Sequence, residues 1–158
     1  VFGYLKAVHQ QEFFSHQIAL NSTLGFINTL ILLTSSWFVA LAFQFARRGN
    51  LKRAKQHYLS ATMFGSCFVI LKATEYSQKF SLGIENLTNT FYTYYFSMTG
   101  LHLFHVIIGM LCLLLTARRC YQTELSDSDL RFMESVGIYW HLVDVLWIFL
   151  FFQIYLLR

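Results

Sequence analysis

The chain has 158 residues, of which 56% are hydrophobic and only 13% are charged, with a formal net charge of +4. Soluble domains average about 45–50% apolar and about 25% charged residues, and a soluble globule of this size could not bury so much apolar surface. Aromatic residues make up 18% of the chain, which excludes a disordered chain of low hydrophobicity. The composition is therefore that of a small integral membrane protein.

Four stretches are long enough to cross a bilayer, which takes about 20 mostly apolar residues. The second of them is the most polar, because it reaches the length of a membrane span only if it includes Lys72 and Glu75. The sequence therefore predicts an all-α, polytopic membrane bundle over residues 25–158, with residues 1–24 as an extracytoplasmic N-terminal segment. The expected transmembrane helices cover residues 25–46, 58–76, 91–117 and 135–157.

The basic residues lie in short segments between these stretches. Residues 47–57 include five Lys or Arg side chains and no acid, and residues 118–134 open with Arg118 and Arg119. Because loops rich in Lys and Arg remain cytoplasmic, the pattern indicates membrane topology rather than binding of nucleic acid. Both chain ends then face the opposite side. An N-terminus on that side without a signal peptide predicts a further, fifth helix before residue 1.

Polar side chains inside a membrane span face protein or a cavity rather than lipid. Lys72 and Glu75 are three residues apart on one expected helix, so they can form an ion pair near its outer end. A proton-relay carboxylate is the alternative role for Glu75. The residues that we expect to make interhelical polar contacts are Lys72, Glu75, His102, His105, His141 and Asp144.

The histidines raise the question of a metal centre. His102 and His105 share one face of the third expected helix, and His141 lies one turn before Asp144 on the fourth. A metal site built from these four residues and a haem-ligating histidine are the alternatives. Two ligands from one helix do not complete a site, so we expect hydrogen bonds between helices instead. His141 is the nearest candidate partner for Asp144.

No catalytic motif accompanies these residues. The chain contains no nucleophile–base pair, no glycine-rich phosphate loop and no paired carboxylates. An independent transporter is a further alternative, but transporters use helices broken by Gly or Pro around a midplane site, and the chain has no Pro. The residues alone therefore indicate a membrane subunit without a catalytic centre of its own.

Four phrases of the sequence resemble one family. Residues 94–109 read YYFSMTGLHLFHVIIG and are similar to the T-G-x-H-x-x-H-V-x-x-G signature of cytochrome c oxidase subunit III. Residues 139–150 read YWHLVDVLWIFL and resemble the family's Y-W-H-F-V-D-x-x-W-x-F-L. Residues 28–36 resemble its N-T-x-x-L-L-x-S-S, and residues 73–76 resemble its E-Y ending. The four phrases follow one another in the family's order.

The resemblance implies a non-catalytic accessory subunit of a respiratory haem–copper oxidase in aerobic electron transport. Such a subunit packs against the catalytic subunit I, binds phospholipid, and supports proton uptake, assembly and turnover. In that family haem and copper belong to partner subunits, so we expect no metal or redox cofactor in this chain. The short form of the family implies a bacterial inner membrane. By position, Arg119 corresponds to an Arg that holds a lipid headgroup there, with Arg118 beside it.

Two features depart from the oxidase pattern. Lys72 stands where that family usually has Gln, and the phrase at residues 35–37 reads SSW. Both features resemble the sequence of a subunit III-like protein associated with bacterial nitric oxide reductase. An accessory subunit of that reductase is therefore the main alternative to an oxidase subunit.

Overall fold

The computed structural model describes residues 22–81 and 90–156, and these residues form helices joined by short turns, without a β-strand. The prediction of an all-α bundle is confirmed. The predicted extracytoplasmic segment falls mostly on residues 1–21, outside the described residues. The helices are α3 (Ser22–Arg47), α4 (Leu51–Ser81), α5 (Thr90–Arg119) and α6 (Asp127–Phe151), which continues as the π-helical turn η2 (Phe152–Leu156).

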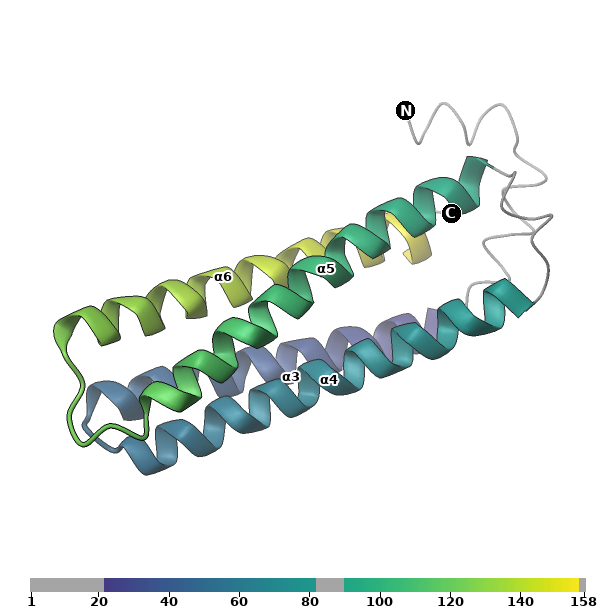
Figure 1. Cartoon of the computed structure of the whole chain (residues 1–158). Coiled ribbons are helices and arrows are strands. Elements are labelled where there is room, and N and C mark those ends of the chain that lie inside the picture. The colour runs from purple at the N-terminus through teal and green to yellow at the C-terminus, as the bar shows by residue number, and fades with distance from the viewer. Residues whose placement is uncertain (1–21, 82–89, 157–158) are drawn as a thin grey trace.

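The four helices run up and down in an antiparallel bundle (Figure 1). Helix α3 packs against α4 and α6, and α5 packs against the same two helices. The α3–α4 and α5–α6 turns lie together at one end of the bundle, which we call the turn end. The four helices thus form a ring in which each helix has two neighbours.

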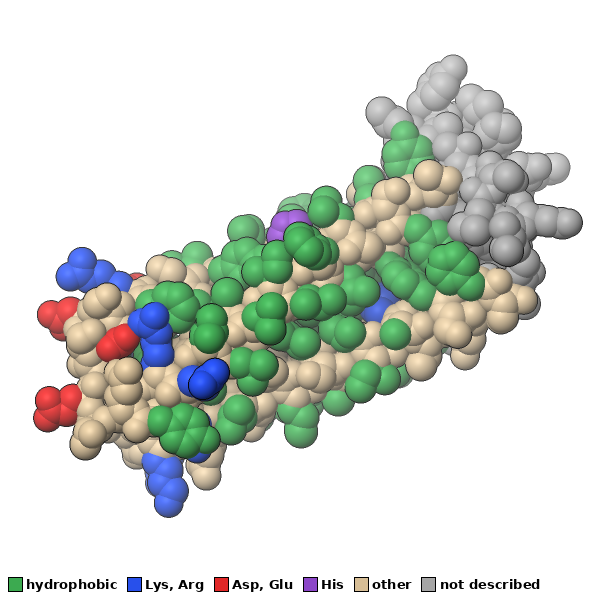
Figure 2. Space-filling model, viewed as in Figure 1, with side chains coloured by type: hydrophobic (Ala, Val, Ile, Leu, Met, Phe, Trp, Pro, Cys, Tyr) green, Lys and Arg blue, Asp and Glu red, His purple; other side chains and the backbone are tan. Residues whose placement is uncertain are grey.

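Three of the helices are long and apolar enough to cross a membrane: α3, α5 and α6. Helix α4 is long enough but more polar, because basic residues occupy its first turns and Lys72 and Glu75 lie within it. Since α3 and α5 run in the same direction, α4 must return across the same membrane. Figure 2 shows hydrophobic side chains over the middle of the bundle and charged side chains gathered at the turn end, as expected for a multi-pass membrane protein.

The first basic segment is mostly helical, whereas the sequence predicts a loop over residues 47–57. Helix α3 ends in a Schellman motif, in which Asn50 N–H donates to the Phe45 carbonyl at 3.0 Å and Gly49 N–H donates to the Ala46 carbonyl at 3.1 Å. Gly49 has a φ of +76°, which suits a residue without a Cβ. The turn is therefore only a few residues long, and three of the five basic side chains belong to the start of α4.

The last helix also begins earlier than the predicted start at residue 135. Ser126 and Asp129 form a capping box, since the Ser126 hydroxyl accepts from Asp129 N–H at 3.2 Å and the Asp129 carboxylate accepts from Ser126 N–H at 3.1 Å. This cap starts α6 within the polar segment 118–134. The helix therefore extends beyond the apolar stretch and carries charged residues on its first turns.

One buried tryptophan sets how closely three helices approach. Trp140 of α6 is 0% exposed, and its indole lies over Gly109 of α5 and Gly65 of α4. A Cβ added at Gly109 would lie 2.7 Å and 2.8 Å from two ring atoms of Trp140. A Cβ at Gly65 would lie 3.1 Å from the same indole. At Gly109 only glycine leaves room for the ring, and at Gly65 an added methyl group would press on Met110 and Trp140.

We predict that Gly109→Ala destabilises the bundle by about 1–3 kcal/mol, because the added methyl group overfills the contact with Trp140. Gly100→Ala on the same helix is the matched control. Nothing lies within 4 Å of a Cβ at Gly100, so this change should be neutral or slightly stabilising. Unfolding of the purified protein by SDS titration in detergent measures both, and equal effects of the two substitutions would contradict the packing argument.

Candidate functional site

Lys72 and Glu75 form a buried ion pair on α4. The Lys72 Nζ lies 2.9 Å from Glu75 Oε2, and the two side chains are 2% and 9% exposed. The second carboxylate oxygen, Oε1, accepts a hydrogen bond of 2.7 Å from the hydroxyl group of Tyr95 on α5. The pair is therefore enclosed between helices, and both oxygens of the carboxylate are bound by protein.

The same pair reaches the remaining two helices. The Lys72 ammonium lies 4.6 Å from the centroid of the Trp147 ring of α6, a cation–π distance. The indole N–H of Trp147 donates in turn to the Thr29 hydroxyl of α3 at 3.1 Å. We call Thr29, Lys72, Glu75, Tyr95 and Trp147 the four-helix polar cluster. It joins all four helices in the half of the bundle away from the turn end.

The two histidines of α5 have different surroundings. His102 is 4% exposed, and its ring packs 5.1 Å from the Trp147 ring and 5.8 Å from the Phe68 ring, measured between centroids. Neither of its ring nitrogens has a hydrogen-bond partner among the described residues. His105 instead contacts its own helix, with Nδ1 at 2.7 Å from the Leu101 carbonyl oxygen. His102 therefore adjoins the four-helix polar cluster, and His105 does not.

His141 and Asp144 lie on the contact between α6 and α3. The expected pairing of His141 with Asp144 does not occur, because His141 Nδ1 contacts the Ser36 hydroxyl of α3. Asp144 is only 4% exposed, and neither carboxylate oxygen has a direct hydrogen-bond partner in the described part of the chain. Of the six residues singled out in the sequence, Lys72, Glu75 and His102 thus lie together at the four-helix polar cluster. The other three, His105, His141 and Asp144, lie outside it.

Tyr95, Trp147 and Thr29 were not singled out in the sequence. One signal for Tyr95 was present, since Tyr95, Thr99 and His102 recur at helical spacing on one face of α5. Trp147 similarly follows Asp144 by three residues on α6. No pattern within one helix shows which neighbouring helix such a side chain meets.

Arg119, the residue expected to hold a lipid headgroup, lies at the turn end. One of its guanidinium nitrogens is 2.6 Å from Asp129 Oδ1, and the group stacks 4.1 Å from the centroid of the Phe132 ring. Hydrogen bonds from the Ser126 hydroxyl and backbone N–H, together with Arg119, hold the pKa of Asp129 below its usual value. Arg119 is still 38% exposed, while Arg118 is exposed and points elsewhere on the helix.

A metal site would need ligands from several elements. In residues 22–81 and 90–156, no three His, Cys, Asp or Glu side chains lie close enough together to hold a metal ion. His102 and His105 turn to different partners, and His141 turns to Ser36. These side chains therefore make contacts within and between helices.

We predict that Glu75→Gln destabilises the protein by about 3–5 kcal/mol, because it removes the countercharge from a buried ammonium group. The double variant Lys72→Met with Glu75→Gln should recover most of this loss, since it buries no net charge and keeps an acceptor for Tyr95. Glu124→Gln in the exposed α5–α6 turn is the control and should have no effect. SDS titration of the purified protein provides the measurement. Equal losses in the single and the double variant would show that the charge itself is not the cause.

Comparison with known proteins identifies the family of the bundle. The family model for cytochrome c oxidase subunit III matches residues 17–158. Cytochrome c oxidase subunit 3 of Arabidopsis thaliana is 37% identical over 131 residues, 82% of this chain and 48% of the relative. The subunit 3 of Pylaiella littoralis is 36% identical over 133 residues, 84% of this chain and 47% of the relative.

The match to a third relative covers most of that relative's length. The subunit 3 of Spodoptera frugiperda is 35% identical over 130 residues, 82% of this chain and 86% of the relative. The chain thus spans about half the length of the plant and algal relatives. These matches, on a bundle of the expected helical architecture, show that the chain belongs to the cytochrome c oxidase subunit III family.

Proposed function

We propose that the chain is a non-catalytic accessory subunit of a haem–copper oxidase that packs against the catalytic subunit I. In this role it supports assembly, proton uptake and turnover, while haem and copper are held by the partner subunits and not by this chain. The observation that carries the proposal is the family match over residues 17–158.

The polar cluster supports a structural role for Glu75. A carboxylate in a proton relay has to exchange its proton with water or with a neighbouring group. Glu75 is 8% exposed, and its two oxygens accept contacts from Lys72 and Tyr95. These contacts favour a role for Glu75 in joining helices over a role in carrying protons.

The membrane is proposed to be the bacterial inner membrane, from the resemblance to the short form of the family. The turn end then faces the cytoplasm, because five basic side chains lie at the α3–α4 turn and the start of α4. The relatives matched above are all from eukaryotes. Fractionation of the source cells checks the compartment directly.

A second candidate function is that of an accessory subunit of a nitric oxide reductase. It is favoured by Lys72, which stands where the oxidase family usually has Gln. The structure gives this Lys a partner in Glu75 and a ring contact with Trp147, so the substitution is accommodated inside the bundle.

Gentle purification through a tag on this chain distinguishes the candidates. We expect subunit I and the copper-site subunit of an oxidase to copurify, identified by mass spectrometry, together with a haem Soret band. A tagged membrane protein of unrelated family is the control. Copurification of a nitric oxide reductase pair would favour the second candidate, and recovery of the chain alone, without haem, would contradict both.

Arg119 is also proposed to bind the phosphate of a phospholipid, with Arg118 beside it. One guanidinium nitrogen bonds Asp129, and an Arg has five N–H donors, so others remain for a phosphate. We predict that Arg119→Gln lowers the phospholipid retained by the purified complex. Asp129→Asn is the control, because it breaks the same ion pair and keeps the guanidinium. Equal lipid retention in Arg119→Gln and the parent protein would contradict lipid binding at this residue.

A further inference from the structure

His105 lies at the middle of helix α5, at a depth where a membrane contains neither water nor lipid headgroups. The apolar span of this helix runs from Thr93 to Arg119, so about 20 Å of helix lies on either side of His105. The hydrocarbon core of a bilayer is about 30 Å thick, and a histidine side chain is too short to reach an interface from its centre. The imidazole is nevertheless only partly buried by the bundle.

The contacts of this imidazole ring determine which kind of partner it can accept. Nδ1 lies 2.7 Å from the Leu101 carbonyl oxygen. Because a carbonyl oxygen only accepts, Nδ1 carries the hydrogen, and Nε2 of the neutral ring is then an acceptor. Nε2 has no hydrogen-bond partner in the part of the chain that the structure describes. His105 therefore presents an unused acceptor on a partly exposed ring.

Apolar side chains of α5 and α6 surround this acceptor on the outer surface of the bundle. Leu101 is exposed one turn before His105 on the same side of α5. On α6, the Tyr139 hydroxyl donates to the His105 carbonyl oxygen at 3.3 Å, and Leu142 and Leu146 are exposed at helical spacing after Tyr139. The two stripes of side chains thus adjoin. We call Leu101, His105, Tyr139, Leu142 and Leu146 the α5–α6 face.

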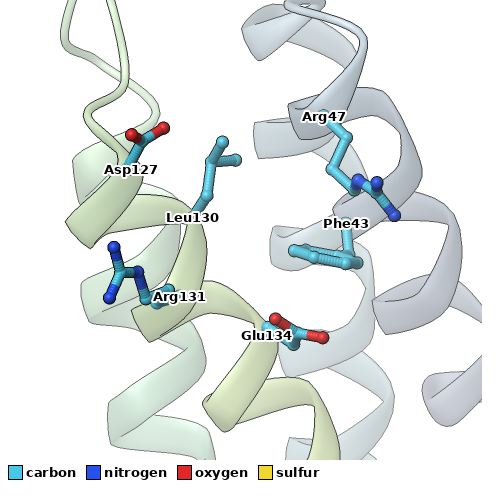
Figure 3. A pocket seen from close by; sticks show the side chains of 6 residues that line it. All are labelled: Phe43, Arg47, Asp127, Leu130, Arg131 and Glu134. Atoms are coloured by element: carbon cyan, nitrogen blue, oxygen red, sulfur yellow. The ribbon is translucent and has the colours of Figure 1, made fainter.

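His141 of α6 is also exposed, but water can reach it. A cavity of about 350 Å³ is lined by His141 together with Arg47 and Glu134. These two charged residues also line the cavity of about 310 Å³ at the turn end (Figure 3). The two cavities therefore adjoin and lead from His141 to the polar end of the bundle. His105 lines neither of them.

We propose that the α5–α6 face binds a transmembrane helix of the catalytic subunit, and that a side chain of this helix donates a hydrogen bond to His105 Nε2. An unpaired polar group in hydrocarbon is costly, and at this depth only another protein can supply a donor. Ser, Thr, Asn or Gln on the partner helix provides one. The identity of the partner rests on the proposed function.

A second copy of this chain fits the face less well. Two copies related by an axis along the membrane normal would bring their α5–α6 faces together at equal depth. Each His105 would then meet the same acceptor on the other copy. The Tyr139 hydroxyl at this depth already donates to the His105 carbonyl oxygen. The face therefore lacks the donor that its own His105 requires, and a different helix has to supply it.

Photocross-linking in the purified complex tests where the partner helix lies. The variant Leu101→benzoylphenylalanine should cross-link to the catalytic subunit, identified by mass spectrometry. Ile107→benzoylphenylalanine is the matched control. Ile107 is exposed within one turn of His105, but two residues along a helix place it on nearly the opposite side of α5. The control should give lipid adducts and no cross-link to the catalytic subunit.

Substitution of His105 tests the hydrogen bond itself. His105→Leu should weaken copurification of the catalytic subunit about three- to tenfold, because hydrogen bonds between membrane helices have this order of strength. His105→Gln keeps a side-chain acceptor and should retain most of the association. SDS titration of the chain alone is the folding control. His105→Leu should leave its unfolding unchanged, since Nε2 has no partner within the described bundle.

Three results would overturn the proposal. The first is equal copurification of the catalytic subunit with His105→Leu and with the parent chain. The second is a cross-link from Leu101→benzoylphenylalanine to lipid, to a second copy of this chain or to a different subunit. The third is a loss of stability of the isolated chain in His105→Leu, which would assign His105 a role inside the bundle. Absence of the catalytic subunit from the parent complex would contradict the proposed function as well, so the two failures are distinguished.

Discussion

The charged pair inside the bundle is the constraint on which the arrangement of its helices depends. A Lys or Glu side chain in a membrane interior is costly unless it is paired and enclosed by protein. Lys72 and Glu75 meet this condition only when two other helices supply contacts to α4: Tyr95 of α5 bonds the carboxylate, and Trp147 of α6 covers the ammonium. Helix α4 therefore belongs in the membrane as a member of the bundle, although its own hydropathy is lower than that of its neighbours.

A different contact fixes the bundle nearer its middle. Trp140 fills the space between α4, α5 and α6, and the two glycines that face it leave room for the indole. Association of helices in lipid depends on close packing and on polar contacts, because lipid is as apolar as the side chains. The polar cluster and the Trp140 contact supply these two kinds of contact at different depths. Because the two contacts lie at different depths, each of them limits how far the helices can shift at the depth of the other contact.

The sequence predicted the helices well and their ends poorly. Length and hydropathy predict where α3, α5 and α6 lie in the sequence. An apolar stretch ends at the first charged residues, however, whereas a helix can continue through them. Helix α6 starts at Asp127 because Ser126 and Asp129 cap it, and α4 starts next to Gly49 and Asn50. Both starts depend on short capping signals inside polar segments, and hydropathy does not show such signals.

The candidate site shows the same division between local and tertiary information. The pair of Lys72 and Glu75 follows from a spacing of three residues on one helix, so it could be predicted. His141 and Asp144 have the same spacing, yet His141 contacts Ser36, 105 residues away in sequence. Spacing states which residues share a helix face, and only the packing of α3 against α6 decides which group that face meets.

The basic residues of the turn end illustrate why charge counts alone do not locate a binding site. All of them add positive charge to the same end of the bundle, which is the pattern expected of cytoplasmic segments. Arg119 is partly neutralised by Asp129, which is itself held by the α6 cap. Arg47 and Arg131 instead belong to the lining of a cavity that also includes two carboxylates. The same residue type thus stabilises a turn at one place and lines a cavity at another, and the local acids distinguish the two settings.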